Sequence, residues 1–96
     1  MIASFADQAT TDVFNGKSTK AARTLAKDVW PVIQRKLDMV NAAATLADLR
    51  VPPGNRLEAL RGNQRGRYSI RVNDQYRITF RFEEGTAHEV RCEDYH

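Results

Sequence analysis

The sequence has few of the residues that build metal and redox sites: of its 96 residues, one is cysteine and two are histidine. Because Cys92 is alone, the chain forms no internal disulfide and no zinc site built on several cysteines. His, Cys, Asp and Glu do not cluster at the spacings of metal ligands, so we expect no metal and no other cofactor. A single cysteine is typical of a reducing compartment, and we expect the protein to be cytoplasmic.

Long apolar runs are also missing. No stretch approaches the ~18 consecutive apolar residues that a membrane-spanning helix needs, so we expect no membrane partner. The segment from Met1 to Asp7 has no Lys or Arg and no apolar run, which argues against a signal peptide. The length and a hydrophobic content of 42% predict one globular domain over residues 1–96.

Lysine is absent where positive charge is most concentrated. Residues 50–82 contain eight arginines, no lysine and two acids, for a net charge of +6, whereas residues 83–96 carry −4. The planar guanidinium of arginine grips phosphate with two parallel hydrogen bonds and stacks on bases, which lysine does not do. The basic segment therefore indicates a phosphate or nucleic-acid interface. A solvated surface, or one covered by an acidic protein, is the alternative.

The first half of the chain has a helical pattern. We expect a short helix that is capped by Asp7 and ends near Gly16. Apolar side chains of residues 21–44 recur every three or four positions and so line one stripe: Leu25, Val29, Ile33, Leu37 and Val40. Pro31 interrupts the pattern, which predicts either a kink or a new helix that begins near Pro31, capped by Asp28 or Trp30.

After a break at Val51-Pro52-Pro53-Gly54, the apolar period changes to two. We expect hairpin strands over 67–72, 76–82 and 86–92, with a further short strand within 57–61, and therefore an antiparallel sheet. One face must pack against the helices, and it carries Tyr68, Ile70, Val72, Ile78, Phe80 and Phe82. The predicted fold class is α+β, with N-terminal helices packed on a twisted antiparallel β-sheet.

The opposite face of this sheet is predicted to present arginines, namely Arg67, Arg71, Arg77 and Arg81. Like charges on paired strands repel one another by several tenths of a kcal/mol each, and a bound polyanion relieves that repulsion. We therefore expect RNA contacts from the arginines of this region: Arg56, Arg65, Arg67, Arg71 and Arg81. The alternative is that Glu89 or another acid of the last strand pairs with them.

Several segments resemble the HigB-type toxins of bacterial toxin–antitoxin modules, which belong to the RelE/ParE superfamily. They are Arg50-Val51-Pro52-Pro53-Gly54-Asn55-Arg56-Leu57-Glu58, Leu60-Arg61-Gly62, Tyr68-Ser69-Ile70-Arg71-Val72-Asn73, Gln75-Tyr76-Arg77-Ile78-Thr79-Phe80 and the closing Glu93-Asp94-Tyr95-His96. The resemblance implies a single α+β toxin domain of a type II module. It implies an endoribonuclease that cuts mRNA on the ribosome, and a helix-turn-helix antitoxin of the HigA type that neutralises it.

The chemistry of metal-independent RNA cleavage indicates what the site needs. The 2′-OH attacks the neighbouring phosphorus and the 5′-oxygen leaves, so the protein must take a proton, stabilise the phosphorane and return a proton. The resemblance implies that Arg77 and Arg61 hold the scissile phosphate. It also points to His96, whose imidazole suits both proton transfers near neutral pH.

Three further residues have two readings each. Tyr95 either stacks on a base or transfers a proton, or it merely covers the edge of the sheet. Asp94 either orients His96 or a nucleotide, or it is a solvated carboxylate. Glu58 stands where some HigB-type toxins carry histidine, so it is either a general base or an ion-pair partner of Arg61 or Arg77.

Two other functions stay open at this point. A ParE-like relative would poison DNA gyrase without cutting RNA, and a basic module would bind RNA without catalysis. Arg77 and the closing Asp94-Tyr95-His96 favour the nuclease.

Overall fold

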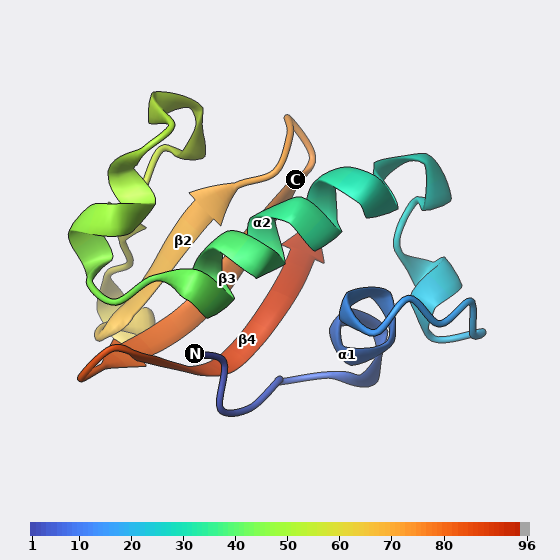
Figure 1. The fold of residues 1–96 in the computed structure, drawn as a ribbon, viewed down its shortest axis with the longest axis horizontal. Helices are drawn as coiled ribbons and strands as arrows, with labels where there is room; N and C mark the ends of the chain where they lie inside the picture. Colours follow the sequence, from blue (N-terminus) through green and yellow to red (C-terminus); the bar gives the residue numbers. More distant parts are fainter. Residues whose placement is uncertain (95–96) are drawn as a thin grey trace.

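The computed structural model describes residues 1–94, in which the longer of two helices lies across one face of a four-stranded sheet and the shorter one lies beside the last strand (Figure 1). The strands are β1 (Glu58–Ala59), β2 (Arg67–Arg71), β3 (Tyr76–Glu83) and β4 (Thr86–Asp94). They lie side by side in sequence order and every adjacent pair is antiparallel. The α+β class and its helix-on-sheet layering are thus confirmed. The short strand expected within 57–61 is present as β1, which is only two residues long.

Helix α1 (Gln8–Phe14) begins and ends where its sequence predicts. The side chain of Asp7 accepts a hydrogen bond of 2.9 Å from the backbone N–H of Thr10, which satisfies one of the free donors of the first turn. Gly16, with φ of 72°, follows the last turn in the left-handed conformation that glycine adopts without strain.

Helix α2 (Trp30–Ala42) begins one residue before Pro31, so the predicted new helix near Pro31 is confirmed and Pro31 lies in its first turn. Proline fits there because the first-turn N–H groups have no partner within the helix. The predicted cap is wrong: Val29 is the N-cap, and neither Asp28 nor Trp30 caps the helix. The indole of Trp30 instead donates a 2.9 Å hydrogen bond back to the carbonyl of Leu25.

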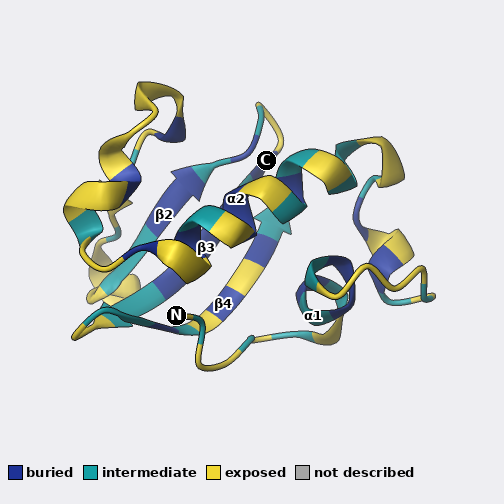
Figure 2. Cartoon of the chain, viewed as in Figure 1, coloured by how far each residue is buried: buried dark blue, intermediate teal, exposed yellow. Residues whose placement is uncertain are grey.

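The hydrophobic core lies between α2 and the sheet (Figure 2). Bulky fully buried side chains come from both layers, namely Ile33, Leu37, Ile70, Ile78 and Phe80. The inner face predicted from the strand alternation is confirmed, with Tyr68 and Phe82 half-buried at its margin. Each buried side chain of this size contributes roughly 1.5–3 kcal/mol to folding, which fixes the sheet's other face toward solvent.

Irregular segments cover the two edges of the sheet. Along β4, Ile2 and Phe5 form parallel bridges with Ala87 and Val90. At the other edge β1 is only two residues long. There the 3-10 turn η4 (Pro53–Asn55) packs beside β2, and the 3-10 turn η3 (Leu46–Arg50) packs against η4. No helix in the described part of the chain is long and apolar enough to cross a membrane.

A buried polar pair joins α2 to η4. The ammonium of Lys36 donates a hydrogen bond to the side-chain oxygen of Asn55, which is itself fully buried. The amide nitrogen of Asn55 donates to the carbonyl of Leu49 at 3.2 Å. Burial lowers the pKa of Lys36, and the positive charges of Arg35 and Arg71 lower it further. This pair holds the chain in place immediately before Arg56.

Candidate functional site

A pocket of about 210 Å³ lies on the open face of the sheet, away from α2. Its lining brings together four of the residues singled out in the sequence, with one addition: Arg56, Glu58, Arg71 and Arg77, together with Ser69. The strand register explains this gathering, because Ser69 lies opposite Glu58 and Arg71 lies opposite Arg77. Residues two apart on a strand share a face, so Ser69 and Arg71 point to the same side.

Arg56 reaches this pocket from η4 rather than from a strand. Its backbone is left-handed, with φ of 46° and ψ of 55°, a conformation that is unfavourable for a residue other than glycine. The Lys36–Asn55 pair anchors the residue before it. Residues with such strained backbone conformations cluster at active sites and ligand-binding sites, where the surrounding structure holds them in place.

The pocket has more positive than negative charge. Three guanidinium groups line it together with one carboxylate, that of Glu58. Arg71 also pairs with Asp74 in the following turn. Such an excess of arginine in a concave site attracts a phosphate, which accepts several charge-assisted hydrogen bonds at once.

Glu58 does not form the predicted ion pair. It is exposed on β1, and among residues 1–94 no Lys or Arg side chain lies within 4.0 Å of its carboxylate. The pairing with Arg61 or Arg77 is therefore wrong in the described structure. The physical reason is that Arg61 belongs to the loop beyond β1, and that Arg77 lies on β3, which β2 separates from β1. A role as general base stays a prediction.

Arg61 and Arg65 lie outside the pocket. They flank the 3-10 turn η5 (Gly62–Gln64), and both are exposed. Neither side chain forms a hydrogen bond or ion pair with another described residue. This loop thus offers two accessible guanidinium groups at the margin of the arginine face. By arginine face we mean the side of the sheet that carries Arg67, Arg71, Arg77 and Arg81.

Asp94 ends β4, where it lies opposite Tyr76 and accepts a 2.9 Å hydrogen bond from the side chain of Gln75. Strand alternation puts it on the opposite side of the sheet from Arg77, whose partner in the register is Glu93. The other two candidates at this end, Tyr95 and His96, lie outside the described residues.

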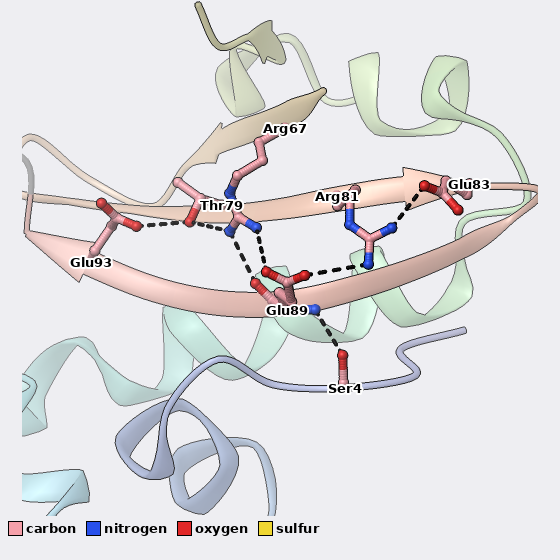
Figure 3. A network of polar contacts seen from close by, with 7 residues as sticks. All are labelled: Ser4, Arg67, Thr79, Arg81, Glu83, Glu89 and Glu93. Carbon is pink, nitrogen blue, oxygen red and sulfur yellow. Dashed lines mark hydrogen bonds and ion pairs between the residues drawn. The ribbon is translucent and has the colours of Figure 1, made fainter. Parts of the chain in front are cut away.

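The far half of the arginine face is neutralised within the chain (Figure 3). The carboxylate of Glu89 lies 3.6 Å from Arg67 and 3.3 Å from Arg81, while Glu83 lies 2.7 Å from Arg81. The hydrogen bond that Arg81 donates to the carboxylate of Glu83 raises the pKa of Arg81, and the Glu89 carboxylate acts in the same direction. The alternative in which acids pair with the arginines is thus realised for Arg67 and Arg81.

Sequence reasoning missed the polar residues between the arginines. Ser69 lines the pocket, and Thr79 accepts a 3.2 Å hydrogen bond from Arg67 while donating one of 2.8 Å to Glu93. The sequence contained the signal. Ser69 stands two residues from Arg67 and Arg71, and Thr79 stands two residues from Arg77 and Arg81, so both share the face of the arginines. Within residues 1–94, no group of three His, Cys, Asp or Glu residues is placed to hold a metal ion.

Comparison with known proteins gives the family. A family model described as a RelE-like toxin of the type II toxin–antitoxin system HigB matches residues 3–96. The chain belongs to the HigB-like toxin family. Toxin HigB-1 of Vibrio cholerae is 46% identical over 68 residues, which cover 71% of this chain and 72% of that toxin. An uncharacterized protein of Haemophilus influenzae is 44% identical over 59 residues, covering 62% and 58% of the two chains.

Solved structures give the fold of this HigB-like toxin. A chain of the YoeB–YefM complex from Staphylococcus aureus matches all of it and 95% of its own length, with a TM-score of 0.63 and 22% identity. The fold is therefore that of RelE-like toxins. The resemblance inferred from the sequence is confirmed, and the protein is a RelE-like toxin of a type II toxin–antitoxin system.

Proposed function

We propose that this HigB-like toxin is a ribosome-dependent, metal-independent endoribonuclease whose pocket binds the scissile phosphate of mRNA. The observation that supports this most directly is the convergence of Arg56, Arg71 and Arg77 with Glu58 around one hollow of the open face. Its volume of about 210 Å³ is below the ~300–1,000 Å³ of typical small-molecule sites. A phosphate held as part of a longer chain fits such a pocket better than a complete small ligand does.

The proposed chemistry assigns a task to each group. Arg71 and Arg77 stabilise the charge that develops on the phosphorane when the 2′-OH attacks. The carboxylate of Glu58 takes the proton from that hydroxyl, since it lies in the pocket without a bound cation among the described residues. His96, with Tyr95, is proposed to return a proton to the leaving 5′-oxygen, whereas Asp94 lies on the other side of the sheet from Arg77 and is given no task in the pocket.

The remaining arginines are proposed to hold the RNA on either side of the cleavage point. Arg61 and Arg65 present accessible guanidinium groups on the loop around η5. Arg67 and Arg81 extend the face along β2 and β3. Contacts of this kind position the substrate without reading its sequence.

The proposed partners follow from the family. A toxin of a type II system is held inactive by its antitoxin, and we propose a helix-turn-helix antitoxin of the HigA type in the cytoplasm. The solved relative in the YoeB–YefM complex supports a protein partner for this fold. The ribosome and mRNA are the other proposed partners.

The test replaces Arg77 by alanine and maps transcript ends in a translation reaction supplied with purified toxin. We expect cleavage to fall about 10²–10³-fold, the loss seen when one preorganised charge-stabilising group is removed. The matched control is Arg35→Ala, because Arg35 is an exposed arginine of α2, on the far side of the sheet. Glu58→Gln should also slow cleavage and remove the dependence of the rate on ionisation of that carboxylate.

Two outcomes would overturn the proposal. One is intact transcripts with the wild-type toxin, and a stall of DNA supercoiling in the same extract would then assign the toxin to gyrase poisoning. The other is full cleavage by Arg77→Ala, which would remove the pocket from the reaction. Circular dichroism of each variant verifies that the fold is retained.

A further inference from the structure

The part of the arginine face that lies beyond the pocket is built around one pair of residues. Arg67 of β2 and Arg81 of β3 lie directly opposite each other in the strand register. Their side chains are 18% and 38% exposed, so their charges are only partly screened by water. Two like charges directly opposite across a strand pair are unfavourable unless an anion lies between them.

Glu83 pairs with Arg81 alone, whereas the carboxylate of Glu89 lies between the two arginines and uses both of its oxygens. Oε2 lies 3.6 Å from Nη1 of Arg67, and Oε1 lies 3.3 Å from Nη2 of Arg81 (Figure 3). Arg67 additionally donates a 3.0 Å hydrogen bond to the backbone carbonyl of Glu89. A carboxylate that bridges two guanidinium groups occupies the position that two oxygens of a phosphodiester would take.

The backbone of Glu89 adopts an unusual conformation that places this carboxylate. The register between β3 and β4 shifts between Thr79 and Arg81, so β4 contains one extra residue, and φ of Glu89 is 53°. A bulge of this kind re-aims a side chain, and the left-handed conformation is unfavourable for glutamate. The N–H of Glu89 is held by a 2.9 Å hydrogen bond to the hydroxyl of Ser4, far away in sequence.

This carboxylate is also easy to displace. Its side chain is 56% exposed, and ion pairs open to water are weak. A second pocket of about 280 Å³ opens beside it on the Arg67 side, lined by Ala6, Gln64, Arg67, Glu89, Arg91 and Glu93. Arg67 stands four residues from Arg71 on the same strand face, about 13 Å along β2.

We propose that Arg67 and Arg81 form a second phosphate site of the toxin, which Glu89 closes in the free protein and a phosphodiester of RNA opens by displacing its carboxylate. The exchange replaces the charge of the Glu89 carboxylate by that of a phosphodiester, while Glu83 stays paired with Arg81. This inference rests on the proposed function, because it assigns the second site to the same RNA strand that enters the pocket.

The test is Glu89→Gln, measured as binding of a short fluorescein-labelled single-stranded RNA by fluorescence anisotropy at several salt concentrations. Removing the competing charge recovers about one charge-assisted contact, so Kd should fall about tenfold. The log–log salt slope should become steeper by about 0.7 for each phosphate gained. Adding Arg67→Gln to Glu89→Gln should abolish the gain.

The matched control is Glu84→Gln, which removes the same charge from an exposed residue of the adjacent turn that pairs with no described residue. It should leave both Kd and the slope close to those of the wild type. Equal effects of Glu89→Gln and Glu84→Gln, or an unchanged slope in Glu89→Gln, would overturn the second site.

The outcomes also separate this inference from the proposed function. If Glu89→Gln changes RNA binding no more than Glu84→Gln does while Arg77→Ala still abolishes cleavage, the ribonuclease stands and the second site fails. If Glu89→Gln tightens RNA binding in a toxin that cuts no mRNA, the second site stands and the ribonuclease fails. Thermal denaturation of each variant verifies that the bulge has not unfolded.

Discussion

Replacing Asn55 by alanine should destabilise the toxin far more than the loss of one ordinary hydrogen bond. Asn55 is fully buried, and its side chain serves two buried partners, the ammonium of Lys36 and the carbonyl of Leu49. The alanine variant leaves a buried cation without its acceptor and a backbone carbonyl without its donor. Leaving such groups unsatisfied costs about 1–3 kcal/mol each and more for a charged one, so we expect a total of about 3–5 kcal/mol.

That figure is large for a domain of this size. Small domains are stable by about 5–15 kcal/mol, and each kcal/mol shifts Tm by about 4–8 °C. Asn55→Ala should therefore lower Tm by at least about 12 °C. Arg56, the next residue, should lose its fixed position in the pocket, so RNA binding by the folded fraction should weaken as well. Urea denaturation followed by the fluorescence of Trp30 gives the free energy of unfolding.

A second substitution isolates the cause. Lys36→Met keeps most of the side-chain volume and removes the charge whose burial lowers the pKa of Lys36, so it should cost only about 1–2 kcal/mol. In the double variant no cation is left without a partner. Its loss of stability should therefore be smaller than the sum of the two single losses by at least about 1 kcal/mol, which is a typical coupling between residues in contact. Strictly additive effects, or a loss below about 0.5 kcal/mol for Asn55→Ala, would refute the reasoning.

Two other predictions concern the ends of the chain. Asp7→Ala should destabilise the protein by about 1 kcal/mol in urea denaturation, because α1 loses its cap and Arg91 loses its ion pair with Asp7. Asp28→Ala removes an equal charge from an exposed turn and should have no comparable effect. Burial raises the pKa of the Cys92 thiol from 9.0 to about 12, so the unfolded chain loses this proton first as pH rises. The free energy of unfolding should thus fall above pH 9.0, by up to about 1.4 kcal/mol per pH unit. Cys92→Ala should flatten that decline, and an equally steep decline in the variant would assign it to other groups.

The local parts of the fold were predictable from short stretches of sequence. Asp7 as a cap and Pro31 in the first turn of α2 act through backbone groups within one helical turn, so neighbouring residues determine them. The alternation around Arg71 and Arg77 likewise determines a face of the sheet, because successive side chains of a strand point to opposite sides. The cap predicted at Asp28 or Trp30 was wrong because Asp28 lies in the 3-10 turn η2 (Lys27–Val29), one residue before the N-cap, and Trp30 is the first residue of α2.

Sequence by itself therefore determined which residues form helices and strands and that arginines share one face of the sheet. Only the tertiary structure decided which of those arginines line the pocket and which pair with Glu89. Arg56 joins the pocket because Lys36 holds Asn55, and Glu89 reaches Arg67 because a bulge and Ser4 turn it there. These contacts join residues far apart in the chain, and their geometry depends on how strands and turns pack against one another, which no local pattern encodes.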